Sequence, residues 1–309
     1  MTSATGVLVM AHGTPRTLED LPAFYTEIRR GRRPPPALLA DLERRYRAIG
    51  GLSPLNERTD EQLEGIRRAL DRRAPGAFRL AAGSKFADPR IEDAVGELAA
   101  TGVSHIVGVV LAPHYSAASI GEYARRAVSA ASAAPGSPVL DMVEQWHDAP
   151  GFVALVAERV GEARRTLPAD ARSGAHVLFS AHSIPARLVG EGDPYAVQVE
   201  ESARAVAEAA GLSRWSVAWQ SAGRTADEWL GPDVGAVIED LAGRSCPAVV
   251  LCPIGFVSDH LEVLYDIDIE AAGVARRAGM AFARTASLNA DPRFCDVLAG
   301  VVMDRAAVG

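Results

Sequence analysis

A run of acidic residues late in the chain has the spacing expected of metal chemistry. Glu262, Asp266 and Glu270 recur every four residues. On an α-helix this spacing places the three side chains on one face, about 6 Å apart along the axis. Like charges so arranged destabilise a helix unless a cation or another partner compensates them. The pattern indicates a carboxylate ladder for a divalent metal ion, although a solvated acidic face would have the same spacing.

A histidine at the end of an apolar run is a second candidate for chemistry. His182 follows such a run and precedes a turn that contains Pro185. Neutral imidazole binds metals and accepts protons near neutral pH. A single histidine is more often structural, but His12 and His114 also follow apolar runs. Because ligands bind at the carboxyl ends of parallel strands, we expect His182 to belong to a functional site.

Two further segments suit a flat, acidic ligand. The turn that contains Trp229 is rigid and apolar, so it is either a structural corner or the wall of a pocket for an aromatic ring system. Four arginines lie close together at Arg29, Arg30, Arg32 and Arg33. They form either a solvated helix end or a site for carboxylates, which guanidinium groups bind through two hydrogen bonds.

These segments together resemble the ferrochelatase family. The matching blocks are collinear and cover nearly the whole chain; they are residues 8–15, 28–31, 49–55, 112–116, 179–185, 219–233 and 253–266. The resemblance implies that His182 and Glu262 are the catalytic residues on either side of a porphyrin. It also implies a set of metal-binding residues: His182, Glu262, Asp266 and Glu270. The porphyrin-binding residues expected from it and from the turn above are His12, Arg29, Arg45, Ser53, Ser119, Tyr123 and Trp229.

The function that the resemblance implies is insertion of ferrous iron into a porphyrin, here coproporphyrin III to give coproheme, in heme biosynthesis. Iron is then a substrate, and no organic cofactor is expected. Relatives of the coproporphyrin type usually carry Tyr at the position of His12. A histidine there resembles the smaller cobalt and nickel chelatases, so a cobalt or nickel chelatase acting on a related tetrapyrrole stays an alternative. A non-catalytic heme or porphyrin carrier is another, although a carrier needs no acidic ladder.

Short β-branched runs alternate with amphipathic stretches, which predicts α/β structure with parallel sheets. The predicted strands are Gly6–Ala11, Phe78–Ala82, His105–Leu111, Pro138–Val143, Ala175–Ala181, Trp215–Gln220, Ala248–Pro253 and Ala281–Thr285. The family resemblance implies two Rossmann-like domains, each a four-stranded parallel sheet flanked by helices, with the active-site cleft between them. We place these domains at residues 1–145 and 146–287. A C-terminal helix within residues 288–309 can pack back on the first domain.

Composition narrows the class of protein further. The net charge of −7 argues against nucleic-acid binding, which needs clustered Lys and Arg. No apolar run approaches the roughly 20 residues of a membrane-spanning helix. The three cysteines are scattered, which fits a reducing compartment and leaves too few thiolates for a four-cysteine iron–sulfur cluster. We expect a cytoplasmic monomer that contacts porphyrin and ferrous iron, with transient contacts to neighbouring heme-pathway enzymes.

Overall fold

The computed structural model describes residues 4–225 and 227–308, which form two compact units. The first unit comprises the chain up to Trp146, residues 258–261 and the chain from Asn289 onwards. The second comprises His147–Val257 and Glu262–Leu288. The chain therefore enters the first unit three times.

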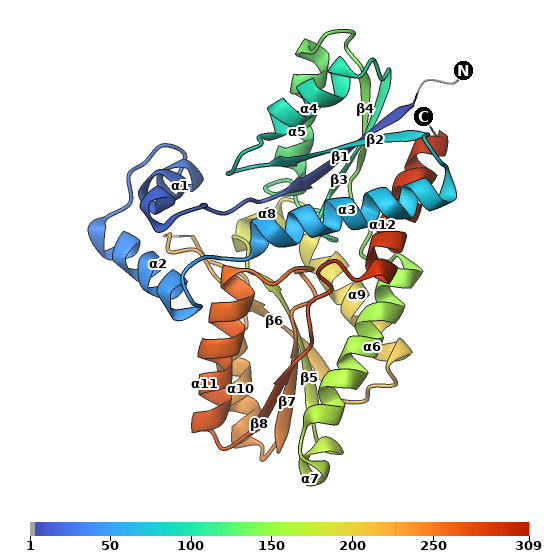
Figure 1. The fold of residues 1–309 in the computed structure, drawn as a ribbon. Helices are drawn as coiled ribbons and strands as arrows, with labels where there is room; N and C mark the ends of the chain where they lie inside the picture. The colour runs from blue at the N-terminus through green and yellow to red at the C-terminus, as the bar shows by residue number, and fades with distance from the viewer. Residues whose placement is uncertain (1–3, 226, 309) are drawn as a thin grey trace. The chain divides into compact units, whose positions relative to one another are not determined.

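The first unit contains a parallel sheet with helices on both faces (Figure 1). Its strands are β1 (Thr5–Ala11), β2 (Phe78–Ser84), β3 (His105–Val110) and β4 (Val139–Val143), in the order β2-β1-β3-β4. Its helical segments are η1 (Leu18–Asp20), α1 (Leu21–Ile28), α2 (Pro36–Ala48), α3 (Leu55–Arg73), α4 (Ile91–Ala100), α5 (Ile120–Ala133) and α12 (Pro292–Val308). Helices α4 and α5 bury their apolar faces against Leu8, Met10 and Ile106 of the sheet. Helix α12 packs along α3, β3 and β4.

The second unit repeats this architecture. Its strands are β5 (His176–His182), β6 (Trp215–Gln220), β7 (Ala248–Cys252) and β8 (Ala281–Arg284), parallel and in the order β6-β5-β7-β8. Its helical segments are α6 (Pro150–Thr166), α7 (Ala169–Arg172), α8 (Ala186–Gly190), α9 (Tyr195–Ala209), α10 (Val234–Gly243), η2 (Val263–Ala271) and α11 (Ala272–Arg277). Side chains of α10, η2 and α11 form one core with Leu178, Val249 and Leu251 of the sheet. The two four-stranded parallel sheets flanked by helices confirm the predicted fold class.

The acidic segment differs from the expected α-helix. Residues Val263–Ala271 form a π-helix, in which the backbone N–H of Ala272 donates to the carbonyl of Ile267, five residues earlier. The prediction of an α-helix was wrong here because a four-residue spacing of charges does not distinguish the two hydrogen-bond registers. π-helical turns are rare and occur frequently at functional sites. Among the described residues, no helix has the length and apolar character needed to cross a membrane.

Candidate active site

In the second unit, the carboxyl end of β5 holds His182 in one orientation. The backbone N–H of Ser183 donates to the carbonyl of Gln220 at 2.8 Å, which joins the end of β5 to the end of β6. The Nδ1 atom of His182 donates to the carbonyl of Ser183, so the Nε2 atom is the one that faces other groups. That atom lies 3.6 Å from Oε1 of Glu262. The two residues predicted to be catalytic are therefore a contacting pair.

This pairing controls the protonation of His182. Burial lowers the pKa of His182, but the Glu262 carboxylate, the Ser183 carbonyl and the charge of Asp266 together raise it to about 9. At neutral pH the resting pair is therefore an imidazolium and a carboxylate. His182 must lose its proton before it can bind a metal ion through Nε2.

A glycine lets the loop that leads to Glu262 approach His182. The N–H of Gly255 donates to the carbonyl of Ser180 at 3.2 Å. A Cβ atom at Gly255 would lie 2.8 Å from the Cβ of Ala181 and 3.0 Å from its Cα. Real side chains do not pack so closely, so this approach requires glycine.

The three acidic residues of the ladder differ in exposure. Glu270 is exposed, Asp266 is 9% exposed, and Glu262 is half-buried beside His182. Asp266 accepts a short hydrogen bond from the hydroxyl of Ser221, which follows β6. Ser221 lies 45 positions before Asp266, and no spacing in the sequence links the two residues. Across the described residues, no three His, Cys, Asp or Glu side chains are grouped closely enough to hold a metal ion.

The indole of Trp229 lies beside the histidine. The ring centroids of His182 and Trp229 are 6.4 Å apart and the planes are inclined by 56°. Backbone pairing between residues 184–186 and 228–230 holds the Trp229 segment, and the hydroxyl of Ser183 donates to the carbonyl of Leu230 at 2.9 Å. Gly223 leaves room for the indole, because a Cβ there would collide with it. Trp229 can therefore form an aromatic wall next to the His182–Glu262 pair.

In the first unit, His12 follows β1 and packs among aromatic rings. Its Nδ1 lies 2.9 Å from the carbonyl of Gly13 and donates to it, which makes Nε2 the nitrogen that can bind a metal ion. The ring of Phe86 lies 4.8 Å away between centroids and that of Phe24 lies 6.2 Å away. Gly13 has φ +79°, and a Cβ there would lie 2.7 Å from that of Ala87, so only glycine suits this turn.

The other residues predicted to bind porphyrin occupy the same unit but differ in character. Arg29 ends α1; its guanidinium lies 5.8 Å over the Tyr25 ring, and its buried Nε has no hydrogen-bond partner. Arg45 is paired with Asp41 at 3.2 Å. The remaining three precede or begin helices, with Ser53 8% exposed before α3, Ser119 at the N-cap of α5, and Tyr123 4% exposed in the core. Arg29 offers a buried donor that lacks a partner and suits a carboxylate.

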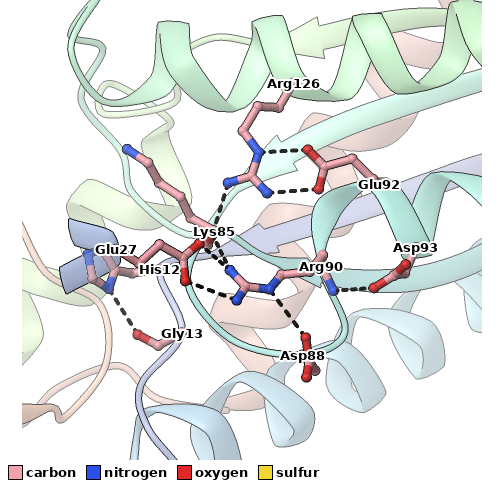
Figure 2. Close-up of polar contacts among 9 residues, drawn as sticks. All are labelled: His12, Gly13, Glu27, Lys85, Asp88, Arg90, Glu92, Asp93 and Arg126. Carbon is pink, nitrogen blue, oxygen red and sulfur yellow. Dashed lines mark hydrogen bonds and ion pairs between the residues drawn. The ribbon is translucent and has the colours of Figure 1, made fainter. Parts of the chain in front are cut away.

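Figure 2 shows a polar network around Lys85 that the sequence analysis did not predict. Lys85 is the only lysine in the chain. It is 8% exposed, its Nζ lies 2.7 Å from Glu122, and it stands 5.2 Å from the Phe86 ring centroid. Two guanidinium groups, from Arg90 and Arg126, donate to its backbone carbonyl. The ring of Phe86, the next residue along the chain, contacts His12. A lone lysine was the only signal for this network in the sequence.

Comparison with known protein families identifies the family of this chain. The family model described as Ferrochelatase matches residues 4–306. The chain belongs to the ferrochelatase family. A coproporphyrin III ferrochelatase of Geobacillus kaustophilus is 44% identical over 302 residues, which cover 97% of this chain and 95% of that protein. The coproporphyrin III ferrochelatase of Bacillus subtilis is also 44% identical over 302 residues, or 97% of each chain.

Further matches come from one sequence and from two solved structures. A ferrochelatase of Herpetosiphon aurantiacus is 40% identical over 98% of this chain and 99% of its own. The structure of SirB from Bacillus subtilis with Fe3+ matches with a TM-score of 0.60 and 14% identity, over 98% of this chain and 96% of that chain. The cobalt complex of the sirohydrochlorin chelatase SirB gives a TM-score of 0.59 and 10% identity, over 98% and 96%. At such low identity these likenesses concern the fold alone.

Proposed function

We propose that this ferrochelatase-family chain inserts ferrous iron into coproporphyrin III and forms coproheme. The observation that carries the proposal is the His182–Glu262 pair beside the Trp229 ring, at the end of an acidic helix. A porphyrin holds two N–H protons inside a rigid ring, and a metal ion enters only as they leave. A base within hydrogen-bond reach of a pyrrole nitrogen and a group that carries protons away are therefore needed.

The protonation state of the pair supports a division of roles between its two residues. His182 already holds a proton at neutral pH, since its pKa is raised to about 9. Glu262 is the carboxylate of the pair, so it accepts the two pyrrole protons in turn and passes the first one on before it takes the second. Asp266 and the exposed Glu270 then offer a route for protons from Glu262, through a buried carboxylate, to solvent. His182 becomes a ligand for the incoming iron once its own proton has left.

Arg29 supports the recognition of an acidic porphyrin. Its partnerless, buried Nε suits a carboxylate, because an unsatisfied buried donor costs about 1–3 kcal/mol. Coproporphyrin carries four carboxylates and protoporphyrin carries two. The three free cysteines support a reducing compartment, and we keep the cytoplasmic monomer as the expected form of the protein.

The direct test is anaerobic incubation of the protein with ferrous iron and either coproporphyrin III or protoporphyrin IX, followed by visible absorbance. We expect repeated turnover with coproporphyrin III and slower insertion into protoporphyrin IX. A stoichiometric complex without turnover would instead identify a porphyrin carrier.

The position of His12 favours one alternative, a cobalt or nickel chelatase. An exposed imidazole with Nδ1 engaged at Gly13 can present Nε2 to a metal ion. Competition between Fe2+, Co2+ and Ni2+ in the same assay separates the two activities. If His12 binds the iron of the product, the product spectrum should differ between the wild type and His12→Ala.

A further inference from the structure

Two arginines of the first unit make nearly the same contacts. Arg90 and Arg126 each place an Nη1 atom on the Lys85 carbonyl, at 3.0 and 2.9 Å (Figure 2). Each also forms a two-bond pair with a glutamate. Arg90 pairs with Glu27 at 2.6 and 3.0 Å, and Arg126 pairs with Glu92 at 2.8 and 2.7 Å. The two networks differ in which helix carries the glutamate.

The glutamate that Arg90 neutralises lies next to the arginine-rich end of α1. Glu27 is two residues before Arg29, and the N–H of Arg30 donates to its carbonyl at 2.8 Å. Glu27 also lines a surface hollow together with Arg30 and Arg33. A bare carboxylate here would repel the carboxylates of an acidic ligand and would compete with them for the neighbouring arginines.

The other contacts of Arg90 hold its side chain in the position in which it pairs with Glu27. Its Nε donates to Asp88 at 3.2 Å, and its backbone N–H donates to Asp93 at 3.0 Å. Hydrogen bonds to Glu27 make the largest contribution to a pKa of Arg90 above its usual value, so the charge is always present. Glu92, the partner of Arg126, belongs instead to the first turn of α4.

We infer that Arg90 is a specificity-determining residue for acidic porphyrins, because it neutralises Glu27 beside the Arg29 end of α1. The inference rests on the proposed function. It assigns Arg90 an indirect role through Glu27 and no contact with the reacting atoms. Arg126 provides a matched control, because its loss removes the same kinds of contact yet leaves Glu27 paired.

The experiment measures metal-free binding of coproporphyrin III and protoporphyrin IX by absorbance titration. It uses the wild type, Arg90→Ala, Arg126→Ala and the double variant Arg90→Ala/Glu27→Gln. We expect Arg90→Ala to weaken coproporphyrin binding about fivefold, the size of one exposed charge interaction. Protoporphyrin binding should fall less. Arg126→Ala should bind both porphyrins within about twofold of the wild type.

The double variant separates charge from folding. If Glu27 is the cause, removing its charge restores most of the coproporphyrin affinity, although Arg90 is still absent. Equal losses in Arg90→Ala and Arg126→Ala, or no recovery in the double variant, would overturn the inference while leaving wild-type iron insertion, and so the proposed function, intact. A wild type that neither binds coproporphyrin III nor metallates it would overturn both. Thermal unfolding of each variant confirms that the compared proteins are folded.

Discussion

The His182 imidazole and the Glu262 carboxylate depend on each other. Burial alone would favour a neutral histidine, whereas the carboxylate 3.6 Å away favours the imidazolium. Glu262 is in turn a carboxylate that is only half-buried, so it can exchange protons with its neighbours. Neither residue type explains the site by itself; the contact between them does.

Loss of either member should abolish most of the iron insertion. We expect His182→Ala and Glu262→Gln each to reduce turnover at least about a hundredfold, the effect of losing a positioned acid–base group. Porphyrin affinity should change much less. His176→Ala is a suitable control, because His176 lies at the opposite end of β5 and contacts Ser216. Near-normal turnover in either site variant would contradict the assignment.

The pair also predicts a pH dependence. NMR titration of the metal-free protein should give His182 a pKa of about 9. In Glu262→Gln the pKa should fall well below that of the wild type, since burial then lowers it without the opposing charge of the Glu262 carboxylate. A pKa that stays near 9 in this variant would show that another group protonates the histidine.

The raised pKa of His182 determines how the free energy of unfolding changes with pH. Protonation of His182 stabilises the folded state fully below the unfolded pKa of about 6.5, and this contribution disappears as the pH rises through 9. The free energy of unfolding should therefore differ most between the wild type and Glu262→Gln near pH 6. The difference should shrink toward pH 9.5, as chemical denaturation would measure.

The π-helix η2 and the loop before it form the element that presents the acidic residues. Asp268 of this helix is held by Arg284 of β8 through bonds of 2.7 and 3.1 Å, while Asp266 is held by Ser221. Asp266 and Asp268 are thus bonded to residues at two different strands of the sheet. These two contacts fix the rotation of the helix about its axis. The close packing of Gly255 against Ala181 fixes the position of the loop from which the helix begins.

A methyl side chain at position 255 should displace the loop that leads to Glu262. We expect Gly255→Ala to lower the free energy of unfolding by about 1–3 kcal/mol, the cost of overpacking. Iron insertion should fall because the Glu262 end of the loop shifts away from His182. Gly161→Ala on α6 is the control; no backbone lies against that position, and helical alanine should stabilise by about 0.5–1 kcal/mol. Unaltered activity and stability in Gly255→Ala would refute this account.

The whole chain builds its first unit from three separate segments. Helix α12 returns after the second unit and packs on α3, where Cys295 lies against Gly65. The buried Phe294 ring lies 5.7 Å from that of Trp146, at the end of the unit's first segment. The unit's core is therefore incomplete until the C-terminal helix has joined it.

Substitution of Gly65 by alanine tests whether α12 packs tightly against α3. A Cβ there would collide with the Cys295 sulfur, so Gly65→Ala should destabilise the protein by about 1–3 kcal/mol. Gly96→Ala on α4 meets nothing within 4 Å and should be neutral or stabilising. Equal unfolding midpoints for the two variants in a denaturant titration would argue against tight packing between α3 and α12.

Much of the fold and the second unit's candidate pair could be predicted from the chain's own pattern. Alternating β-branched and amphipathic runs depend on neighbours close in sequence, so the eight strands and their parallel arrangement were predictable. His182 and Trp229 belong to distinctive local motifs, and they were predicted for the same reason. The spacing of Glu262, Asp266 and Glu270 was equally visible, although the α-helical register assigned to it was wrong.

Only the tertiary structure decided how these residues behave. The pKa of His182 depends on Glu262, which is distant in sequence, and the hold on Asp266 depends on Ser221. The Arg90–Glu27 pair joins a loop to a helix that precedes it by some sixty positions. Electrostatic and packing energies depend on distance in space, and the sequence specifies that distance only after the chain has folded.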